Sequence, residues 1–308
     1  IIPVTLPENN TWLGWADFPP SILNGGSSFT NFASDDWLVA MSWIKENTPE
    51  DAIIASWWDY GYWITTLSER TTLADNATLI DWQIKKIAYS LITSPDNSWN
   101  ILNSDHTEDI SEYLGDENVI AWGGVTYSDW LSEKEIRKDC KPVSVTEAKS
   151  SDIDQKLCFP VGKGMGADYL LIYLVGERFY INDSSVALYT LEGGGDESKK
   201  AWFAKISNHQ FSKYIENDNI TPTSYYMENS TLGMLTPFTI FKYVEPNTGR
   251  TFDAYQNGLI PVYVPDLKFE DSENDPFYLV YASPSYYNQQ PGPMSAVLIY
   301  KINHDYNS

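Results

Sequence analysis

Hydrophobic residues in the first third of the chain recur at helical spacing. Residues 1–33 are rich in Pro, Gly, Asn and Ser and have no period, which predicts an extended lead-in. Residues 34–47 begin with a Ser-Asp-Asp cap and place Trp, Met and Ile on one face, and residues 79–91 repeat this amphipathic pattern. We expect both segments to be helices, with short strands at residues 52–55 and 71–74 between them.

The pattern changes in the second half of the chain. Residues 167–175 form a continuous apolar run, which is typical of a buried strand. A triple glycine at residues 193–195 lacks the Lys-Ser/Thr of a phosphate-binding loop, so we interpret it as a flexible entry to a helix over residues 196–215. From residue 237 the period becomes two, with Asn-Thr-Gly and Asn-Gly turns, which predicts a series of antiparallel strands.

These elements predict an α+β fold in three parts. The lead-in at residues 1–33 precedes a helix-rich mixed core at residues 34–236, and a β-rich C-terminal unit occupies residues 237–308. The core is interrupted at about residues 104–165, where polar and charged residues replace the apolar pattern. This stretch is therefore predicted to be an insertion.

Composition excludes several classes of protein. The 308 residues include 42 acidic and 20 basic side chains, a net charge of −22, and 15% of them are aromatic. Such an acidic surface repels phosphate groups, which excludes nucleic acids and anionic lipid surfaces as partners. No apolar run approaches the roughly 20 residues of a membrane helix. We therefore expect the chain to be soluble, and we also expect it to be monomeric. Because it starts at Ile1 and not at Met, we expect it to be a piece of a longer protein.

The two cysteines, Cys140 and Cys158, both lie in the predicted insertion. They are either two free thiols or a disulfide that closes a polar loop. Asn-x-Ser/Thr sequons favour an extracytoplasmic location, where disulfides persist. These sequons lie at Asn9, Asn76, Asn182, Asn219 and Asn229. The sequence has neither a Cys-x-x-Cys motif nor a Cys/His cluster, which argues against a zinc site.

Residues 57–61, Trp-Trp-Asp-Tyr-Gly, are the segment with the most chemical information. Successive side chains of an extended chain point to opposite sides, so at least one of Trp57 and Trp58 is expected at the surface, where its indole N–H can donate. Asp59 adds an acceptor, and Gly61 is expected to let the backbone turn tightly. Donors and an acceptor on one turn suit a ligand hydroxyl. The alternative is a structural turn in which Asp59 caps a helix at residues 62–67.

The segment around this pentapeptide resembles the soluble C-terminal domain of the oligosaccharyltransferase catalytic subunit, the STT3/AglB/PglB family. The resemblance rests on WWDYG itself, on the preceding Asn-Thr-Pro-Glu-Asp-Ala, and on the following Arg-Thr and Asp-Asn-x-Thr. It is dense over residues 34–91, resumes at residues 167–206 and returns weakly at residues 297–302. The acidic composition, with more Lys than Arg, favours an archaeal member.

A second motif of that family is Asp-x-x-Lys with Met or Ile four residues after the Lys. Asp196 and Lys199 match it, but Phe203 stands where Met or Ile is usual. The separation from WWDYG is longer than in the family pattern, and the insertion accounts for the excess. Without the resemblance, Asp196 and Lys199 would be an exposed ion pair at the start of a helix.

The resemblance implies a function for the whole protein. By this resemblance, the whole protein is expected to transfer a lipid-linked, dolichol-type oligosaccharide to the Asn of an N-x-S/T sequon in an acceptor polypeptide. The transfer is expected on the extracytoplasmic face of the cell membrane. In this chain the implied residues bind the +2 Ser or Thr: its hydroxyl lies at the 57–61 turn, and Phe203 supplies an apolar wall for the Thr methyl. The implied binding residues are Trp57, Trp58, Asp59, Tyr60, Gly61, Asp196, Lys199 and Phe203.

The family's catalytic chemistry uses a divalent metal, Mg²⁺ or Mn²⁺, held by carboxylates in the transmembrane portion. We therefore expect neither a metal nor a catalytic residue in this chain, and we predict that the fragment alone is inactive. Two other functions are compatible with the sequence. An acidic, aromatic-rich, sequon-bearing chain also fits an extracellular carbohydrate-binding or surface-layer module. A hydrolase with paired carboxylates ranks last, because no feature singles out such a pair.

Overall fold

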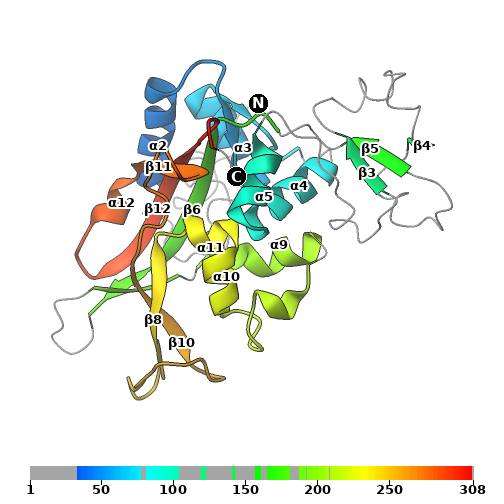
Figure 1. Ribbon diagram of the computed structural model, residues 1–308. Helices are drawn as coiled ribbons and strands as arrows, with labels where there is room; N and C mark the ends of the chain where they lie inside the picture. Colours follow the sequence, from blue (N-terminus) through cyan, green and yellow to red (C-terminus); the bar gives the residue numbers. More distant parts are fainter. Residues whose placement is uncertain are drawn as a thin grey trace, which may run out of the picture.

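The computed structural model describes residues 33–77, 81–103, 119–122, 141–142, 157–160, 165–180, 187–191, 193–207 and 209–306. The fold is α+β, as predicted, and is built on one large sheet with helices on both sides (Figure 1). The predicted lead-in lies outside the described residues up to residue 32, and so does most of the predicted insertion. Among the described residues, none of the helices combines the length and the apolar character needed to span a membrane.

The main sheet has the order β11-β12-β6-β7-β10-β8-β9, and β1 and β2 join it beside β6. Its strands are β1 (Ile53–Ala55), β2 (Thr71–Thr72), β6 (Tyr169–Phe179), β7 (Leu188–Thr190), β8 (Phe238–Val244), β9 (Thr251–Phe252), β10 (Ile260–Pro265), β11 (Phe277–Ala282) and β12 (Gly292–Ile302). The long strands β6 and β12 pair antiparallel, with Tyr173 opposite Val297. The sheet thus continues across residue 237, where the sequence pattern placed the start of a C-terminal unit.

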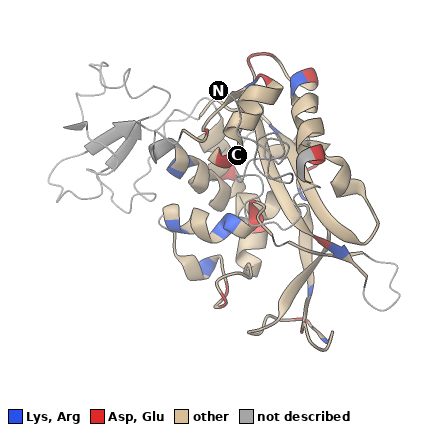
Figure 2. Cartoon of the chain, turned by 180° about the vertical axis from the view of Figure 1, so that it is seen from behind, with Lys and Arg blue, Asp and Glu red and all other residues tan. Residues whose placement is uncertain are grey.

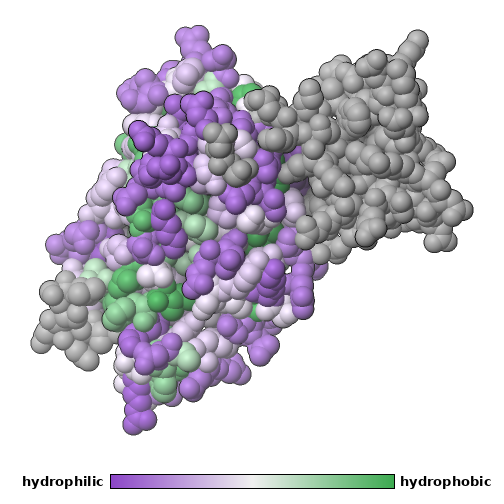
Figure 3. All heavy atoms as spheres, in the orientation of Figure 1, coloured by the Kyte–Doolittle hydropathy of each residue, from purple (hydrophilic) through white to green (hydrophobic). Residues whose placement is uncertain are grey.

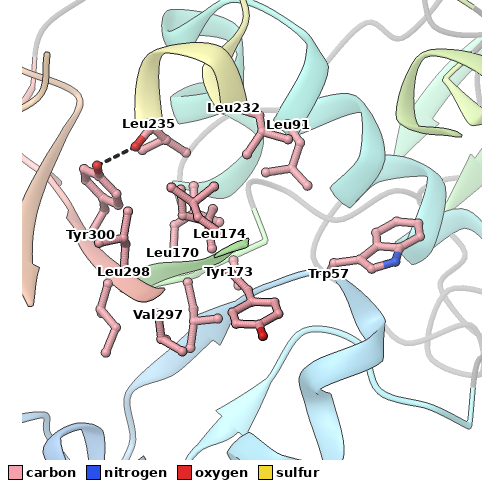
Figure 4. Close-up of a cluster of buried hydrophobic side chains, with 14 of the residues drawn as sticks. Trp57, Leu91, Leu170, Tyr173, Leu174, Leu232, Leu235, Val297, Leu298 and Tyr300 are labelled. Atoms are coloured by element: carbon pink, nitrogen blue, oxygen red, sulfur yellow. Dashed lines mark hydrogen bonds between the residues drawn. The ribbon is translucent and has the colours of Figure 1, made fainter. Parts of the chain in front are cut away.

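Helices cover both faces of the long strands. On one face, Trp37 of α2 (Ala33–Asn47) contacts Tyr173, with ring centroids 5.2 Å apart. On the other face, the Tyr300 hydroxyl donates to the Leu235 carbonyl of α11 (Thr231–Leu235) at 2.5 Å, the bond drawn in Figure 4. Because both faces are covered, every residue of the apolar run from Tyr169 to Val175 is buried.

The other helices are short and surround this core. The sequence pattern correctly predicted α4 (Asp81–Ile92), and α5 (Pro95–Leu102) follows it with Ser94 as its N-cap. The remaining helical segments are η1 (Trp58–Tyr60), α3 (Gly61–Trp63), η2 (Ile64–Ser68), η3 (Glu197–Lys199), α9 (Lys200–Ile206), η4 (Phe211–Lys213), α10 (Ser224–Asn229) and α12 (Pro284–Tyr287). In Figure 1, α4, α5, α9, α10 and α11 gather on one side of the long strands, and α2 and α12 lie on the other.

The helix predicted over residues 196–215 was too long. The segment starts as a 3-10 turn, and α9 ends at Ile206, where Ser207 closes it with an N–H bond to the Phe203 carbonyl. The chain then folds back, and Ile215 forms an antiparallel bridge with Pro222. Ile215, the predicted last residue of the helix, therefore lies in an extended bridge nine positions beyond the end of α9.

A separate small sheet lies within the predicted insertion. It consists of β3 (Val119–Trp122), β4 (Lys141–Pro142) and β5 (Leu157–Pro160), which pair in parallel in the order β3-β5-β4. Cys140 lies outside the described residues, and only the backbone of Cys158 is described. The disulfide between them therefore stays a prediction.

The surface of the described residues is mostly polar. In Figure 3 hydrophilic residues dominate the visible face, and hydrophobic residues are exposed in small groups. In the opposite view, Lys and Arg lie apart on several elements (Figure 2).

Candidate functional site

The WWDYG segment leaves the sheet at the end of β1. Trp57 still has an extended backbone, and the chain then tightens into η1 and α3. Trp57 is buried at the edge of the core (Figure 4), where its ring meets Phe203 edge-on with centroids 4.7 Å apart. Trp58 is half-buried, so it is the indole of the pair that reaches the surface. One buried and one partly exposed tryptophan agree with the alternation expected from the sequence.

Gly61 has a different role from the one predicted. Its backbone is helical, with φ −56° and ψ −43°, so any residue could adopt the conformation. A Cβ atom at this position would lie 2.4 Å from the Ala74 carbonyl oxygen and 2.5 Å from the Asp75 Cα atom. The glycine is therefore required by the close approach of the chain after β2 and not by a tight turn.

The triple glycine docks on β6 and is not simply a flexible entry. Gly193 and Gly194 have φ values of 108° and 110°, which favour glycine. A Cβ atom on Gly195 would lie 2.7 Å from both the Tyr173 carbonyl oxygen and the Val175 nitrogen. The segment thus runs along the edge of β6 between the positions where β1 and β7 pair with that strand.

This docking places Asp196 beside the WWDYG segment. The Asp196 N–H donates to the Tyr173 carbonyl at 2.7 Å, and the Tyr173 N–H donates to Asp196 Oδ2 at 2.8 Å. The Tyr60 hydroxyl donates to the other carboxylate oxygen, Oδ1, at 2.7 Å. Asp196 therefore completes the unpaired edge of β6 and holds the tyrosine of the pentapeptide.

Lys199 joins the two motifs. Its Nζ lies 2.9 Å from Asp59 Oδ2, 2.8 Å from the Tyr60 hydroxyl and 3.4 Å from Asp196 Oδ1. The side chains of Asp59, Asp196 and Lys199 are 16%, 1% and 18% exposed, so this is no surface ion pair. Two carboxylates share one ammonium group in a largely desolvated site, and the exposed-pair alternative for Asp196 and Lys199 is wrong.

Burial determines how these groups titrate. Desolvation raises the pKa of Asp196 above its usual range, although the charge of Lys199 opposes this. Burial, followed by the charge of Asp196, raises the pKa of Tyr60 well above that of an exposed tyrosine. Tyr60 therefore stays protonated, so it can accept from Lys199 while it donates to Asp196.

A second ion pair lies on the same turn and was missed from the sequence. Glu197 and Lys200 are both buried, and their side chains meet at 2.7 Å. The signal was present, because Asp-Glu-Ser-Lys-Lys contains two pairs at i,i+3 spacing. Only the tertiary structure shows that both pairs are shielded from solvent.

Phe203 lies deeper than expected. It is 0% exposed and packs behind Trp57, so in this conformation its ring does not form part of the surface. The partly exposed groups of the site are Trp58, Asp59 and Lys199. A carboxylate offers about four acceptor positions. Asp59 can therefore accept a hydrogen bond from a ligand hydroxyl while it remains paired with Lys199.

The described residues do not offer a metal site. They contain no group of three or more His, Cys, Asp or Glu side chains placed to hold a metal ion.

Comparisons with known proteins agree with the sequence resemblance. Residues 49–126 match the family described as the STT3/PglB/AglB core domain. The dolichyl-diphosphooligosaccharide–protein glycosyltransferase subunit STT3B of Oryza sativa subsp. japonica is 37% identical over 92 residues, which are 30% of this chain and 12% of the relative. The subunit stt-3 of Caenorhabditis elegans is 31% identical over 165 residues, 54% of this chain and 21% of the relative.

The chain thus spans only a small part of these relatives. Among solved structures, the C-terminal globular domain of an oligosaccharyltransferase from Archaeoglobus fulgidus is similar with 12% sequence identity and a TM-score of 0.27. That likeness covers 75% of this chain and 97% of the other. At such a TM-score it carries no argument, and the resemblance to the family is confirmed by the sequence matches.

Proposed function

Because residues 49–126 match the STT3/PglB/AglB core domain, we propose that this chain recognises the acceptor polypeptide for a membrane oligosaccharyltransferase. The whole enzyme would transfer a lipid-linked oligosaccharide to the Asn of an N-x-S/T sequon. This chain would bind the Ser or Thr two residues after that Asn. The observation that carries the proposal is the contact of Lys199 with Asp59, at 2.9 Å, which joins motifs 140 residues apart.

The polar groups suit a hydroxyl ligand. A hydroxyl can donate to the Asp59 carboxylate and accept from a donor such as the Trp58 indole N–H. A hydrogen bond to a charged group contributes about 1.5–3 kcal/mol. A peptide without the hydroxyl buries the Asp59 carboxylate with an acceptor position left unsatisfied, although the ion pair with Lys199 persists. Sites built to bind a substrate hydroxyl can reject analogues that lack it by about 10⁴-fold. Selection of a +2 hydroxyl would therefore depend on the burial of the Asp59 carboxylate as well as on the hydrogen bond that it accepts.

The remaining motif residues hold this arrangement in place. Lys199 orients Asp59, while Tyr60 and Asp196 anchor Lys199 to the edge of β6. We propose that Phe203 acts indirectly. Its ring supports Trp57 from behind, Trp57 packs beside Trp58 with ring centroids 6.0 Å apart, and half-buried Trp58 provides the apolar wall for the Thr methyl. One buried methyl contributes about 0.8 kcal/mol, so the preference for Thr over Ser would be only a few-fold.

The chemistry of transfer would take place elsewhere in the full-length protein. We propose that a divalent metal, Mg²⁺ or Mn²⁺, and its carboxylate ligands belong to a membrane part outside these 308 residues. The chain alone would then be inactive, and in the whole protein it would stand on the extracytoplasmic face of the membrane. The acidic composition leads us to propose an archaeal source.

The test uses the full-length protein and three acceptor peptides that carry Thr, Ser or Val at +2. Val keeps the shape of Thr without the hydroxyl. Asp59→Asn should lower kcat/KM for the Thr peptide about 10- to 150-fold, because a charge-assisted hydrogen bond is lost. The slow reaction of the Val peptide should not fall, because that peptide has no hydroxyl bond to lose. Phe203→Ala should alter the ratio of kcat/KM for Thr and Ser.

Asp51→Asn is the matched control, since Asp51 is exposed and lies just before β1. It should leave all three peptides unaffected. An equal loss for Thr and Val in Asp59→Asn would mean that Asp59 acts on the fold and not on the hydroxyl. Full activity of that variant on Thr would remove the proposal.

A further inference from the structure

We propose that this chain has a second binding site, a pocket that takes a saccharide. The pocket has a volume of about 390 Å³ and is formed by the end of α4, the start of α5, the segment at residues 209–214 and α10. It shares no residue with the Asp59–Lys199 site. Its volume falls in the range of small-ligand pockets, about 300–1,000 Å³.

A row of aromatic rings forms one wall. The rings of Tyr89 and His209 have centroids 5.2 Å apart, His209 and Tyr214 are 5.6 Å apart, and Tyr214 and Tyr225 are 5.6 Å apart. Tyr89 and Tyr214 are buried and pack the four segments together, whereas Tyr225 is 37% exposed. Aromatic rings with a polar edge present both an apolar face and a hydrogen-bonding group. The C–H face of a pyranose ring needs this combination.

Amide and hydroxyl side chains line the rest of the pocket. Asn97 and Gln210 are exposed at its rim, and each amide supplies both donors and an acceptor. Asn97 Nδ2 donates to Thr93 Oγ1 at 3.3 Å, which leaves its carbonyl oxygen available to a ligand. His209 Nδ1 lies 3.0 Å from the Ser207 carbonyl, so in the neutral ring Nε2 is an acceptor. Mixed donors and acceptors match the hydroxyls of a sugar.

Charge favours the same class of ligand. Among the described residues that line the pocket, Lys213 alone is charged, and its Nζ lies 4.1 Å from the Tyr225 ring centroid. In a chain with a net charge of −22, a pocket without a carboxylate admits neutral or acidic sugars. The lining is too polar for an apolar peptide side chain. Two sources offer saccharides of this chemistry, namely the glycan of a lipid-linked donor and a glycan already attached to a protein.

The experiment measures sugar binding to the 308-residue chain by saturation-transfer NMR. The probes are N-acetylglucosamine 1-phosphate, which stands for a donor glycan, and N-acetylglucosamine β-linked to Asn, which stands for a protein glycan. Mannose and glucuronic acid extend the range of sugars. The wild type should bind at least one probe, and the stronger of the first two identifies the source.

The variant Asn97→Ala/Gln210→Ala should weaken that binding about tenfold or more, because two hydrogen bonds are lost. Both side chains are exposed, so the fold should persist, which thermal unfolding checks. Asn288→Ala/Gln289→Ala changes an exposed Asn-Gln pair elsewhere and should bind like the wild type. Trp58→Ala changes the proposed acceptor site and should also bind the sugar like the wild type. This variant therefore shows whether the two sites are distinct.

Three results would overturn the inference. They are the absence of saturation transfer to every probe, unchanged binding by the Asn97→Ala/Gln210→Ala variant, and loss of binding in Trp58→Ala. Transfer of saturation to an Asn-Ala-Thr peptide that is lost in the pocket variant would assign the pocket to polypeptide instead. None of these results depends on whether the Asp59 site recognises a sequon.

Discussion

Asp196 shows how a single buried carboxylate can organise a site. It is almost fully enclosed, yet it accepts hydrogen bonds from the Tyr173 N–H and from the Tyr60 hydroxyl, and it lies near Lys199. A buried charge is costly unless it is paired and hydrogen-bonded. The fold meets this requirement at the open edge of β6, where the Tyr173 N–H needs a hydrogen-bond acceptor and Asp196 supplies it. The same atoms therefore satisfy the strand and position the pentapeptide.

The raised pKa of Asp196 makes stability depend on pH. Between the pKa of an unfolded Asp, about 3.9, and the higher folded value, the folded protein keeps a proton that the unfolded chain has lost. The free energy of unfolding therefore falls as pH rises through this window. Asp196→Asn removes the titration. The stability of the wild type relative to the variant should fall from about pH 4 upward, by at most about 1.36 kcal/mol per pH unit.

Urea unfolding of both proteins at a series of pH values measures this difference. Circular dichroism of the variant serves as a check that the fold is retained. Parallel stability curves, or a wild type that gains relative stability as the pH rises, would show that the pKa of Asp196 is not raised in the folded protein.

At the scale of elements, the site is formed where the 57–61 segment, the 193–196 segment and the edge of β6 meet, at one gap in the sheet. The β1 strand and the β7 strand pair with different parts of the same edge of β6, and the 193–196 segment fills the space between them. The 57–61 segment leaves β1 next to this gap. Gly195 allows the close approach of its segment to β6, and Gly61 allows the chain after β2 to approach the 57–61 segment, because a Cβ atom at either position would clash.

Substitution of Gly61 tests this explanation. Its backbone is helical, so Gly61→Ala would be expected from propensity alone to stabilise by up to about 1 kcal/mol. The clash with the Ala74 carbonyl oxygen and Asp75 Cα is with backbone and cannot be relieved by a side-chain rotation. We therefore expect Gly61→Ala to destabilise the chain by about 1–3 kcal/mol, measured by denaturant unfolding.

Gly61→Asn provides the contrast. Asn tolerates a left-handed backbone, so it would be better accepted than Ala if the glycine were needed for a turn. Close approach instead predicts that Asn is at least as harmful as Ala. A stable Gly61→Asn variant would restore the interpretation made from the sequence.

At the scale of the whole molecule, the sheet joins the beginning, middle and end of the chain. Strand β12, near the C-terminus, pairs along β6, and β6 in turn pairs with β1. The Ser285 N–H donates to Asp36 Oδ1 at 3.0 Å, which ties α12 to α2. Residues 237–308, which the sequence pattern predicted to be a C-terminal unit, thus supply β12, a central strand of the main sheet.

Hydrogen exchange of the native protein tests this cooperativity. Amides of β6 and β12 should exchange with the same high free energy of opening, because neither strand can leave the sheet without exposing the core. Amides of β9 and the adjoining end of β8 lie at the edge of the sheet and should exchange faster. If β8 to β12 open together while β6 stays protected, residues 237–308 form an independent unit.

Local patterns were sufficient for much of the fold. The helices at α2 and α4, the buried strands β1 and β6, and the α+β class follow from hydrophobic period and capping residues, which depend on near neighbours in the chain. These properties are readable from sequence because they arise from contacts within a few residues. The fold also brings polar residues of the WWDYG and Asp-x-x-Lys motifs into contact, and their role in binding stays a prediction.

Other properties depend on segments far apart in the chain. Ile215 pairs with Pro222 and does not continue a helix, and the need for Gly61 depends on the backbone at Ala74. The Asp59–Lys199 contact, the burial of Phe203 and the pocket beside Tyr225 each require elements that only the folded sheet brings together. Sequence alone thus determined which side chains are available, and tertiary structure decided which of them meet and how much water remains around them, since burial is a property of the packed molecule.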